Sequence, residues 1–370
     1  MKSVKLKRVA NIYDGIHETP NYKDSGIKFV SVEDINNLYN SNKYISSSDY
    51  NNLYKIKPQF NDILMTRIGD IGTPAICNKE EPLAYYVSLA LIKPKEINTD
   101  YLYFALQSQL FKKESYRRTI HVAFPKKINL SEIGECLIPL LDLDKQKQVA
   151  TFLNLYYKKI ELFKEKLRLL KLRKNGFLQK LFRNEYSNTY RLSDILKERA
   201  IYSSDKQRYV HATLSKDGVA PKTERYNRDF LVKDEEKKYK ITYLNDICYN
   251  PANLKFGVIC LNTYGTLIFS PIYVTFEINT NLADITYISH FLTYNETIQK
   301  LRKYEEGTVY ERMAVSSDDF LKLKISLPVL AEQKEISKKL SCYDKEIKLI
   351  TNKINLLERY KQGLLQKMFI

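Results

Sequence analysis

The sequence has little of what membrane-spanning, secreted or metal-binding proteins require. No stretch approaches the roughly 20 uninterrupted apolar residues of a spanning helix. The N-terminal MKSVKLKRVANIYDG lacks the apolar core of a secretory signal. The five cysteines stand singly and form no CxxC pair: Cys77, Cys136, Cys248, Cys260 and Cys342. Such spacing indicates reduced thiols that pack among apolar side chains, so we expect a cytoplasmic protein without zinc or disulfides.

Motifs of catalysis are lacking as well. The sequence contains no GxGxxG, GxxxxGK[ST] or HExxH. Its four histidines, His17, His121, His211 and His290, lie too far apart to give a metal-ligand spacing. The string Asn250-Pro251-Ala252-Asn253 is similar to the Asn-Pro-Pro-aromatic signature of amino-methyltransferases, but it lacks the second proline and the aromatic residue. We interpret it as a turn and predict no active site, metal or cofactor in this chain.

What the sequence does have is positive charge, with a formal net charge of +17 over 370 residues. This excess favours a polyanionic partner, such as nucleic acid, an anionic membrane face or an acidic protein. An AT-rich genome, which raises Lys, Asn, Ile and Tyr together, is the alternative explanation. With 44% hydrophobic residues and only 11 glycines and 11 prolines, the chain is predicted to be globular, with two or three domains.

The most informative feature is a repeat. Residues 146–182 align without a gap on residues 333–369, and 16 of the 37 positions are identical. Fainter similarities flank it: Val4–Val9 matches Tyr190–Ile195, Phe60–Leu64 matches Leu244–Cys248, and Tyr101–Phe104 matches Tyr287–His290. The predicted order is therefore module, helix, module, helix.

Each repeat predicts a long helix with a heptad seam. Apolar residues alternate at spacings of three and four over about four heptads, without an internal proline, which is typical of a coiled coil. The two seams are expected to pack on one another; the alternative is that each helix packs on its own module. Gly176 and Gly363 either end the helices or permit close approach of another backbone. The residues predicted for helix packing or partner docking are Leu153, Tyr156, Ile160, Leu167, Gly176, Tyr343, Ile347, Ile354 and Gly363.

The modules between the helices have a mixed pattern. Strands are predicted at 27–32, 62–66, 85–92, 257–261 and 273–278, and helices at 99–116 and 285–304. This pattern favours an α+β domain with a mostly antiparallel sheet in each half. Loops between these elements interleave basic, amide and aromatic residues, as contacts with phosphates and base edges require. The candidate base readers are Arg67, Arg117, Arg118, His121, Arg225, Tyr226, Asn253, Lys255, Tyr310 and Arg312.

These features together are similar to a known family. Each helix begins near a Gln-Lys pair, at Gln146 and Gln333, and ends in Gly-x-Leu-Gln-Lys-x-Phe, at Phe182 and Phe369. Strands start with Asn-Asp-Ile at residues 61–63 and 245–247. The chain thereby resembles, over its whole length, the DNA-specificity subunit of type I restriction–modification enzymes. Pro139 lies two residues further from its helix than Pro328 does from the second, which predicts a shift of the first module on its helix.

The resemblance implies an α+β fold with two target recognition domains, joined by two long antiparallel helices that form a coiled coil and act as a ruler. The implied domains are 1–143 and 187–330, and the helices are 144–186 and 331–370. Each domain would read one half of a gapped target in double-stranded DNA. The implied partners are two methyltransferase subunits and the motor-nuclease subunits of a bacterial or archaeal cytoplasm. S-adenosylmethionine, ATP and magnesium would belong to those partners.

Three other hypotheses remain at the level of sequence. The chain could be a coiled-coil scaffold that binds only protein, which a steep, sequence-dependent loss of DNA affinity with salt would contradict. It could be a stand-alone enzyme such as a methyltransferase–specificity fusion, which cofactor binding by the isolated chain would test. It could also be the specificity chain of a related multifunctional restriction enzyme.

Overall fold

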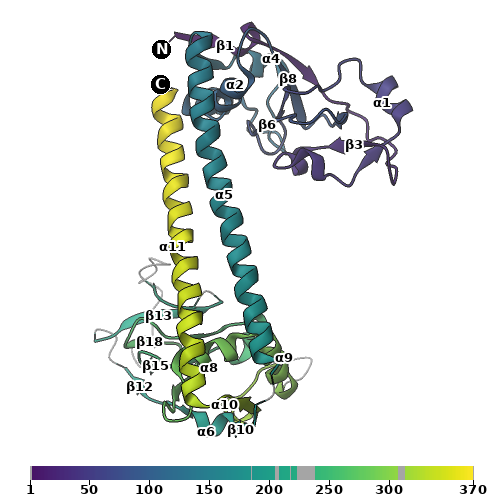
Figure 1. The fold of residues 1–370 in the computed structure, drawn as a ribbon. Helices are drawn as coiled ribbons and strands as arrows, with labels where there is room; N and C mark the ends of the chain where they lie inside the picture. The colour runs from purple at the N-terminus through teal and green to yellow at the C-terminus, as the bar shows by residue number, and fades with distance from the viewer. Residues whose placement is uncertain are drawn as a thin grey trace. The chain divides into compact units, whose positions relative to one another are not determined.

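The computed structural model describes residues 2–184, 186–204, 208–216, 218–222, 238–306 and 313–369. The chain forms two compact units, one of residues 1–165 and 351–370 and the other of residues 166–350. The division falls inside both long helices, α5 (Leu143–Phe182) and α11 (Leu330–Met368), so each helix contributes one part to each unit (Figure 1).

The first module, residues 2–140, combines small sheets with short helices. A four-stranded antiparallel sheet has the order β2-β8-β5-β6, a three-stranded sheet has the order β4-β3-β7, and β1 pairs with β9. Only the β3–β7 pairing is parallel among these strands. The elements are β1 (Lys2–Lys5), η1 (Leu6–Arg8), β2 (Ala10–Asp14), β3 (Ile27–Val30), η2 (Val32–Asp34), η3 (Leu38–Asn40), β4 (Tyr44–Ile45), α1 (Ser47–Leu53), β5 (Ile63–Thr66), β6 (Pro74–Ile76), β7 (Leu83–Tyr85), β8 (Leu89–Pro94), α2 (Thr99–Leu106), α3 (Gln109–Arg118), α4 (Leu130–Glu135) and β9 (Leu137–Leu140).

The second module, residues 188–327, repeats this plan. Its four-stranded antiparallel sheet has the order β11-β19-β16-β17, a second sheet has the order β12-β15-β18-β13-β14, and β10 pairs with β20. The second sheet again contains one parallel pair, β13–β18. The elements are β10 (Asn188–Arg191), α6 (Leu192–Ile195), β11 (Leu196–Glu198), β12 (Tyr202–Ser203), β13 (Val210–Ser215), β14 (Gly218–Pro221), β15 (Tyr239–Thr242), β16 (Ile247–Tyr249), η5 (Pro251–Phe256), β17 (Ile259–Leu261), β18 (Leu267–Phe269), β19 (Val274–Ile278), α8 (Ile285–Thr293), α9 (Asn295–Leu301), η6 (Arg302–Tyr304), α10 (Ser317–Leu321) and β20 (Lys324–Leu327).

The Asn-Asp-Ile motif makes the same corner in both modules. Asn61 and Asn245 have φ values of 68° and 69°, in the left-handed region that asparagine tolerates better than most residues. The following aspartate accepts a backbone hydrogen bond at 2.7 Å in each case, Asp62 from Gln59 and Asp246 from Tyr243. The weak similarity in sequence is therefore a real structural repeat.

Three predicted elements are interrupted in the structure. The helix predicted at 99–116 is two helices, because the Ser108 hydroxyl accepts from the Phe111 N–H and starts α3 anew. The helix predicted at 285–304 breaks at Tyr294, whose backbone is extended. The strand predicted at 85–92 is divided between β7 and β8. Apolar periodicity continues across all three breaks, which is why the sequence did not indicate them.

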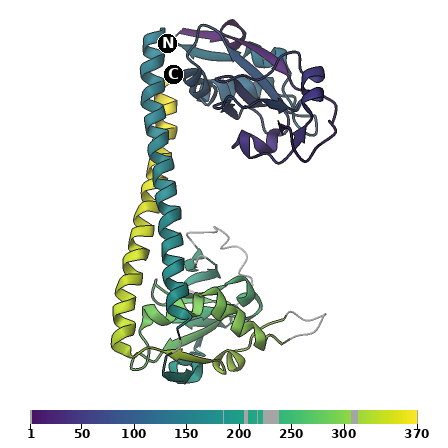
Figure 2. The same cartoon turned by 45° about the vertical axis from the view of Figure 1, so that its right-hand side comes forward.

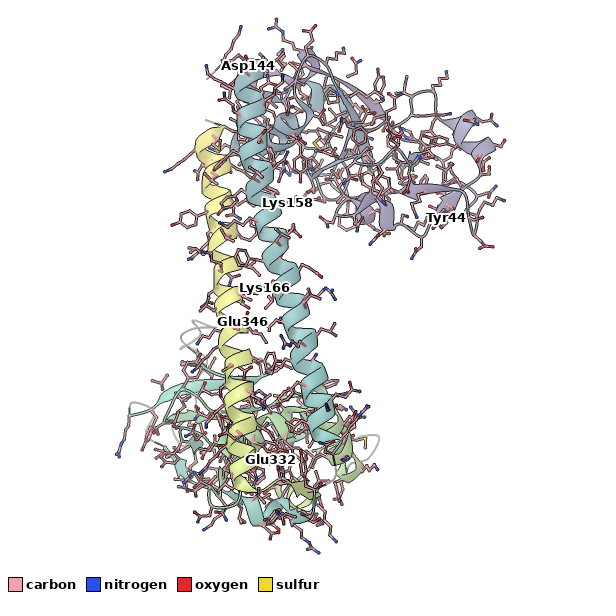
Figure 3. The ribbon with its side chains drawn as sticks, in the orientation of Figure 1. Tyr44, Asp144, Lys158, Lys166, Glu332 and Glu346 are labelled. Carbon is pink, nitrogen blue, oxygen red and sulfur yellow. The ribbon has the colours of Figure 1, made fainter. Side chains whose placement is uncertain are left out.

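Within each unit the two long helices pack antiparallel, and both views place their segments side by side (Figure 1, Figure 2). In the first unit the Tyr156 hydroxyl donates to the Leu357 carbonyl at 3.1 Å, and Lys164 pairs with Glu358 at 3.0 Å. In the second unit Lys166 and Glu346 face one another at 3.2 Å (Figure 3). The predicted coiled-coil packing of the seams is confirmed within each unit.

The first of the two roles predicted for the glycines, ending the helices, is wrong. Both helices continue past Gly176 and Gly363, and a Cβ added at either position would have no neighbour within 4 Å. The described part of the chain thus offers no close backbone contact there, and the glycines reduce helix stability by about 1 kcal/mol each relative to alanine.

The predicted shift of the first module on its helix is wrong. Leu140 and Leu327 end the equivalent strands, opposite Lys2 and Asn188, and Gln146 and Gln333 follow six residues later in both copies (140 to 146, 327 to 333). Pro139 lies inside β9, whereas Pro328 follows β20, so the prolines do not mark equivalent positions.

The conserved spacing is explained by the buried Gln146 and Gln333, which tie each helix to its module. Gln146 Oε1 accepts from the Asn98 N–H and Gln333 Oε1 from the Asp284 N–H, both at 2.9 Å. Asn98 and Asp284 are themselves the N-caps of α2 and α8. One glutamine thus fixes the start of a module helix against the start of each long helix.

The phenylalanines at the C-terminal ends of the two long helices, Phe182 and Phe369, pack into the hydrophobic cores of the units. Phe369 lies in the core of the first unit against Tyr101, with ring centroids 5.3 Å apart. Phe182 packs edge-to-face on Tyr287 in the second unit at 5.6 Å. The Gln-Lys-x-Phe ending therefore has a packing function in both copies.

Candidate nucleic-acid interface

In the first module, two loops that carry predicted base readers are joined by backbone hydrogen bonds. The β5–β6 loop contains Arg67, and the α3–α4 loop follows Arg118. The Gly69 N–H donates to the Lys126 carbonyl at 2.8 Å, and the Ile128 N–H donates to the Arg67 carbonyl at 3.0 Å. Within the second loop, the Ile120 N–H donates to the Lys127 carbonyl at 2.8 Å, which closes residues 120–127 into a narrow loop.

The second module brings the equivalent loops together. The β16–β17 loop holds Asn253 and Lys255 in η5, and the Val315 N–H donates to the Pro251 carbonyl at 3.3 Å. Glu306 and Ala314 exchange two hydrogen bonds of 3.0 Å, in the place that Ile120 and Lys127 occupy in the first module. Both modules therefore hold equivalent residues, Ile128 and Val315, against the loop that follows β5 or β16, and pair the residues that flank the preceding segment, Ile120 with Lys127 and Glu306 with Ala314.

Arg67 is buried and serves as a strut between these loops. It is 7% exposed. Its guanidinium donates to Asp14 Oδ1 and the Val87 carbonyl at 2.9 Å, and to the Ile128 carbonyl at 3.3 Å. These bonds engage the Nε and Nη1 groups with partners inside the protein. The position favours support of the 120–127 loop over contact with a base.

The other basic candidates of the first module are partly paired. Arg117 is exposed and pairs with Glu114 at 2.8 Å, while Arg118 is half-buried between Glu132 at 2.9 Å and Glu114 at 3.5 Å. His121 is exposed, and its Nε2 lies 2.9 Å from the Tyr116 carbonyl. Arg117 and His121 thus keep solvent-facing surface, whereas Arg118 holds α3 to α4.

Two candidates of the second module are described and four are not. Asn253 and Lys255 lie half-buried in η5, which the Asn250 side chain caps and left-handed Gly257 ends. The predicted turn at Asn250–Asn253 is thus one end of this short helix. Arg225, Tyr226, Tyr310 and Arg312 lie outside the described residues. In the sequence, Tyr310 and Arg312 lie between Glu306 and Ala314, which are paired.

Exposed apolar residues on these loops were missed from the sequence. Val122 and Phe124 stand fully in solvent, at 97% and 104% exposure. Phe256 is also exposed, with the ammonium groups of Lys216 and Lys255 at 5.9 and 5.4 Å from its ring centroid. The only sequence signal was an apolar His-Val-Ala-Phe-Pro run followed by two lysines, and sequence alone does not indicate that it is exposed.

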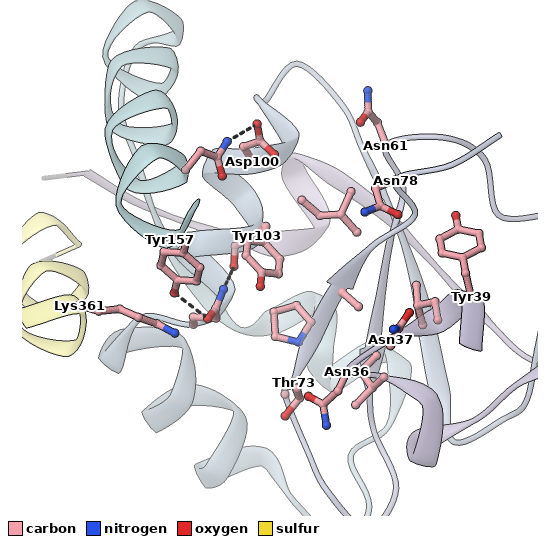
Figure 4. A pocket seen from close by; sticks show the side chains of 18 of the residues that line it. Asn36, Asn37, Tyr39, Asn61, Thr73, Asn78, Asp100, Tyr103, Tyr157 and Lys361 are labelled. Atoms are coloured by element: carbon pink, nitrogen blue, oxygen red, sulfur yellow. Dashed lines mark hydrogen bonds between the residues drawn. The ribbon is translucent and has the colours of Figure 1, made fainter. Parts of the chain in front are cut away.

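The first unit also contains an open pocket of about 790 Å³ beside β6 and α2 (Figure 4). Its walls carry amide and tyrosine side chains, several of them bonded to one another. The Tyr157 hydroxyl donates to Gln107 Oε1 at 3.2 Å, and Asn154 donates to Asp100 at 2.8 Å. These groups suit hydrogen bonding rather than acid–base chemistry.

The described residues form neither a metal-binding cluster nor a membrane-spanning helix. No group of three or more His, Cys, Asp or Glu there is arranged to hold a metal ion. None of the helices in the described ranges is both long and apolar enough to cross a membrane. Burial raises the pKa of the Cys77, Cys136 and Cys260 thiols to about 12, which fits the packing role predicted for them.

Comparison with known families decides the identity of this architecture. The profile of the family described as "Type I restriction modification DNA specificity domain" matches residues 1–172 and 185–359, one match for each repeat. The chain belongs to this family of type I DNA-specificity proteins. The resemblance stated from the sequence is confirmed.

Individual relatives agree. A putative type I restriction enzyme MjaX specificity subunit of Methanocaldococcus jannaschii is 22% identical over 333 residues, covering 82% of this chain and 76% of the relative. The MjaVIII specificity subunit of the same organism is 29% identical over 161 residues, covering 44% of this chain and 34% of that protein.

Solved structures share the fold of this specificity protein. The S subunit of a type I restriction–modification system from M. genitalium has a TM-score of 0.65 at 13% identity, covering 100% of this chain and 96% of that one. A chain from a study of complex assembly and conformational transition of the type I R-M system has a TM-score of 0.57 at 12% identity, with 98% and 96% covered. The predicted α+β fold of two modules with long helices is confirmed.

In the specificity protein, most predicted helix residues face the seam between α5 and α11. Leu153, Ile160 and Ile354 are buried, and the remaining apolar ones are half-buried: Tyr156, Leu167, Tyr343 and Ile347. Leu153 lies in the core of the first unit with Leu365 and Phe369, the Tyr156 hydroxyl bonds to the Leu357 carbonyl, and the Tyr343 ring lies 6.0 Å from Phe177 of α5. Of the predicted set, Gly176 is exposed and Gly363 is partly exposed.

A second apolar stripe lies on the opposite, exposed faces. On α5 it is formed by leucines seven residues apart: Leu155 and Leu162 in the first unit and Leu169 in the second. On α11 the repeat-equivalent positions are Cys342, Leu349 and Leu356, all exposed. We call these the α5 stripe and the α11 stripe. These seven-residue spacings can be read from the sequence. They were not singled out there, because the apolar residues of the seam already explained the heptad pattern of both helices.

Proposed function

We propose that the protein is the DNA sequence-recognition subunit of a type I restriction–modification complex. Each module reads one half of a gapped double-stranded target, and the helices dock methyltransferase subunits. The chain itself performs no chemistry. S-adenosylmethionine, ATP and magnesium bind to the methyltransferase and motor-nuclease subunits of the complex.

The observation that carries this proposal is the duplicated pair of loops. A repeat that pairs the flanking residues Ile120 with Lys127 and Glu306 with Ala314, each beside the loop that follows the equivalent strand, supports two DNA-reading sites of equal design. The sequences inside these loops differ, however: HVAFP at 121–125 against GTVYER at 307–312. Unlike side chains read unlike bases, so the two half-sites differ in sequence.

Among the described residues in and beside these loops, those suited to DNA contact are Arg117 at the end of α3, His121, Asn253 and Lys255. Arg117 and Lys255 are positioned to contact phosphates or guanine edges, and Asn253 to contact adenine. Arg225, Tyr226, Tyr310 and Arg312 complete the proposed set in the second module, while Arg67 and Arg118 support the loops from behind.

The two exposed stripes support docking of two methyltransferase subunits. Leucines at heptad spacing on an exposed helix face usually pack against another helix, because that association removes their apolar side chains from water. One stripe lies on each long helix, at repeat-equivalent positions, and each would receive one subunit. The motor-nuclease subunits join the complex thus formed.

Methylome sequencing tests the proposal directly. Cells that carry this chain together with its methyltransferase partner are expected to gain a two-part, gapped methylation motif that neither protein produces alone. A complex that forms but adds no motif would contradict DNA recognition by this chain and favour a protein-binding scaffold.

A further inference from the structure

The tip of the 120–127 loop, residues 122–125, is largely exposed and yet entirely apolar in its side chains, which is unusual on a protein surface. Val122 and Phe124 expose essentially their whole side chains. The residues from Val122 to Pro125 carry no side-chain hydrogen-bonding group. Burying a fully exposed phenylalanine side chain would gain about 2 kcal/mol of transfer free energy, so its exposure in the free protein points to a binding function.

The base that supports this tip is firmly held. Backbone hydrogen bonds join Ile120 to Lys127, Gly69 to Lys126 and Ile128 to Arg67. The buried Arg67 guanidinium adds bonds to the Ile128 and Val87 carbonyls. The tip thus extends from a supported base, and little ordering is left to be completed when it binds.

The surroundings of the tip are strongly basic. Residues 112–127 contain six lysines and arginines and one acidic residue, Glu114, which is already paired with Arg117 and Arg118. An apolar point within a basic surface complements duplex DNA, where phosphates line the outside and stacked bases lie within the groove.

We propose that Phe124 is a wedge that enters the half-site read by the first module and partly unstacks one base step. This inference rests on the proposed DNA recognition and extends it. Phe and Pro, the residues at 124 and 125, belong to the apolar set that proteins insert between base pairs. Because the tip has no hydrogen-bonding side chain at 122–125, it discriminates by how readily a step unstacks, with pyrimidine–purine steps favoured.

The test uses the complex with its methyltransferase subunits and a duplex that carries the motif found by methylome sequencing. 2-Aminopurine is placed at successive positions of the first module's half-site, avoiding the methylated base, which methyltransferases flip out. The wild-type complex is expected to raise the fluorescence at one step. Phe124→Ala should abolish that rise and increase Kd by about tenfold, the scale of one base–aromatic stack.

Two further variants separate the wedge from a general loss of structure. Phe124→Leu keeps an apolar wedge and should retain part of the fluorescence rise. Phe60→Ala removes an exposed phenylalanine elsewhere in the same module and should leave both readouts unchanged.

Unchanged fluorescence and affinity in Phe124→Ala would overturn the wedge while leaving bipartite recognition intact. A second outcome would also overturn it. If the wild type raises no fluorescence, and Phe124→Ala binds more weakly than the wild type to thymine-containing DNA but equally well to DNA with uracil in place of thymine, Phe124 contacts a thymine methyl group instead. A wild-type complex that yields no gapped motif contradicts the proposed function itself, a result distinct from both.

Discussion

Leu162 and Leu349 offer the sharpest test of how partners dock. They occupy repeat-equivalent positions, one on the α5 stripe and one on the α11 stripe, and are 62% and 70% exposed. Complete burial of a leucine side chain contributes about 1.5–3 kcal/mol. A partner helix that covers the exposed two thirds therefore gains about 1–2 kcal/mol from each leucine.

Leu162→Ala should weaken the binding of one methyltransferase subunit by about 5- to 30-fold, and Leu349→Ala should weaken the other by a similar factor. Native mass spectrometry at limiting concentration should show each single variant shift from two bound subunits to one. The double variant should lose both. Because both side chains are exposed in the free chain, its thermal unfolding should change little.

Leu53→Ala, an exposed leucine on α1, is the matched control and should leave assembly unchanged. Cys342 provides an independent readout, since it is exposed on the α11 stripe while Cys77, Cys136 and Cys248 are buried. A bound subunit should protect Cys342 from alkylation. The reasoning is refuted if the double variant still binds two subunits with wild-type affinity, or if Cys342 reacts equally fast in the complex.

Three further predictions concern single side chains of this protein. Phe369→Ala should lower the free energy of unfolding by about 3–4 kcal/mol in urea titrations, because it empties a buried site against Tyr101, whereas a near-wild-type midpoint would contradict this packing role. Arg67→Ala should lower the free energy of unfolding by about 2–3 kcal/mol, because it removes the donor to the Val87 and Ile128 carbonyls and one of the donors to Asp14, which keeps the Gly15 N–H. It should also weaken the first half-site without changing its sequence. Burial opposes ionisation of Asp344, but hydrogen bonds from His290 and Lys174 hold its pKa below the usual value. Its stabilisation is therefore present above about pH 4 and lost as pH falls through the lowered pKa, and Asp344→Asn should flatten that part of a melting profile.

Periodic features were predictable from the sequence because they are local. The 16 identities between the repeats and the seam spacing gave the helices, their pairing and the order of modules. Breaks within the shorter helices were not predicted, since a capping serine such as Ser108 interrupts the chain without interrupting its apolar pattern.

The candidate site was predicted only to the level of loops. Both described loop pairs contain residues chosen from the sequence, such as His121 and Lys255, because basic residues in turns are visible in a sequence. Burial is not. Arg67 has the same chemistry as an exposed arginine, and its partner Asp14 lies 53 residues away along the chain. The opposite holds for Phe124: it is apolar, so its residue type predicts a place in the core, but its side chain is exposed to solvent.

The seam shows how a repeated chain can fold in only one way. Lys174 and Lys361 are repeat-equivalent, yet Lys174 pairs with Asp344 at 2.5 Å, while Lys361 lies 4.2 Å from the ring centroid of Tyr157, which occupies the position equivalent to Asp344. Exchanging the two helix halves would place each lysine against the other's partner and would take His290 away from Asp344. Distinct polar pairs at one seam position thus specify which helix segment joins which module, as buried polar residues do for register in coiled coils. With that pairing fixed by the helices, the loops of the two modules are free to diverge, which is the condition for reading two unlike half-sites.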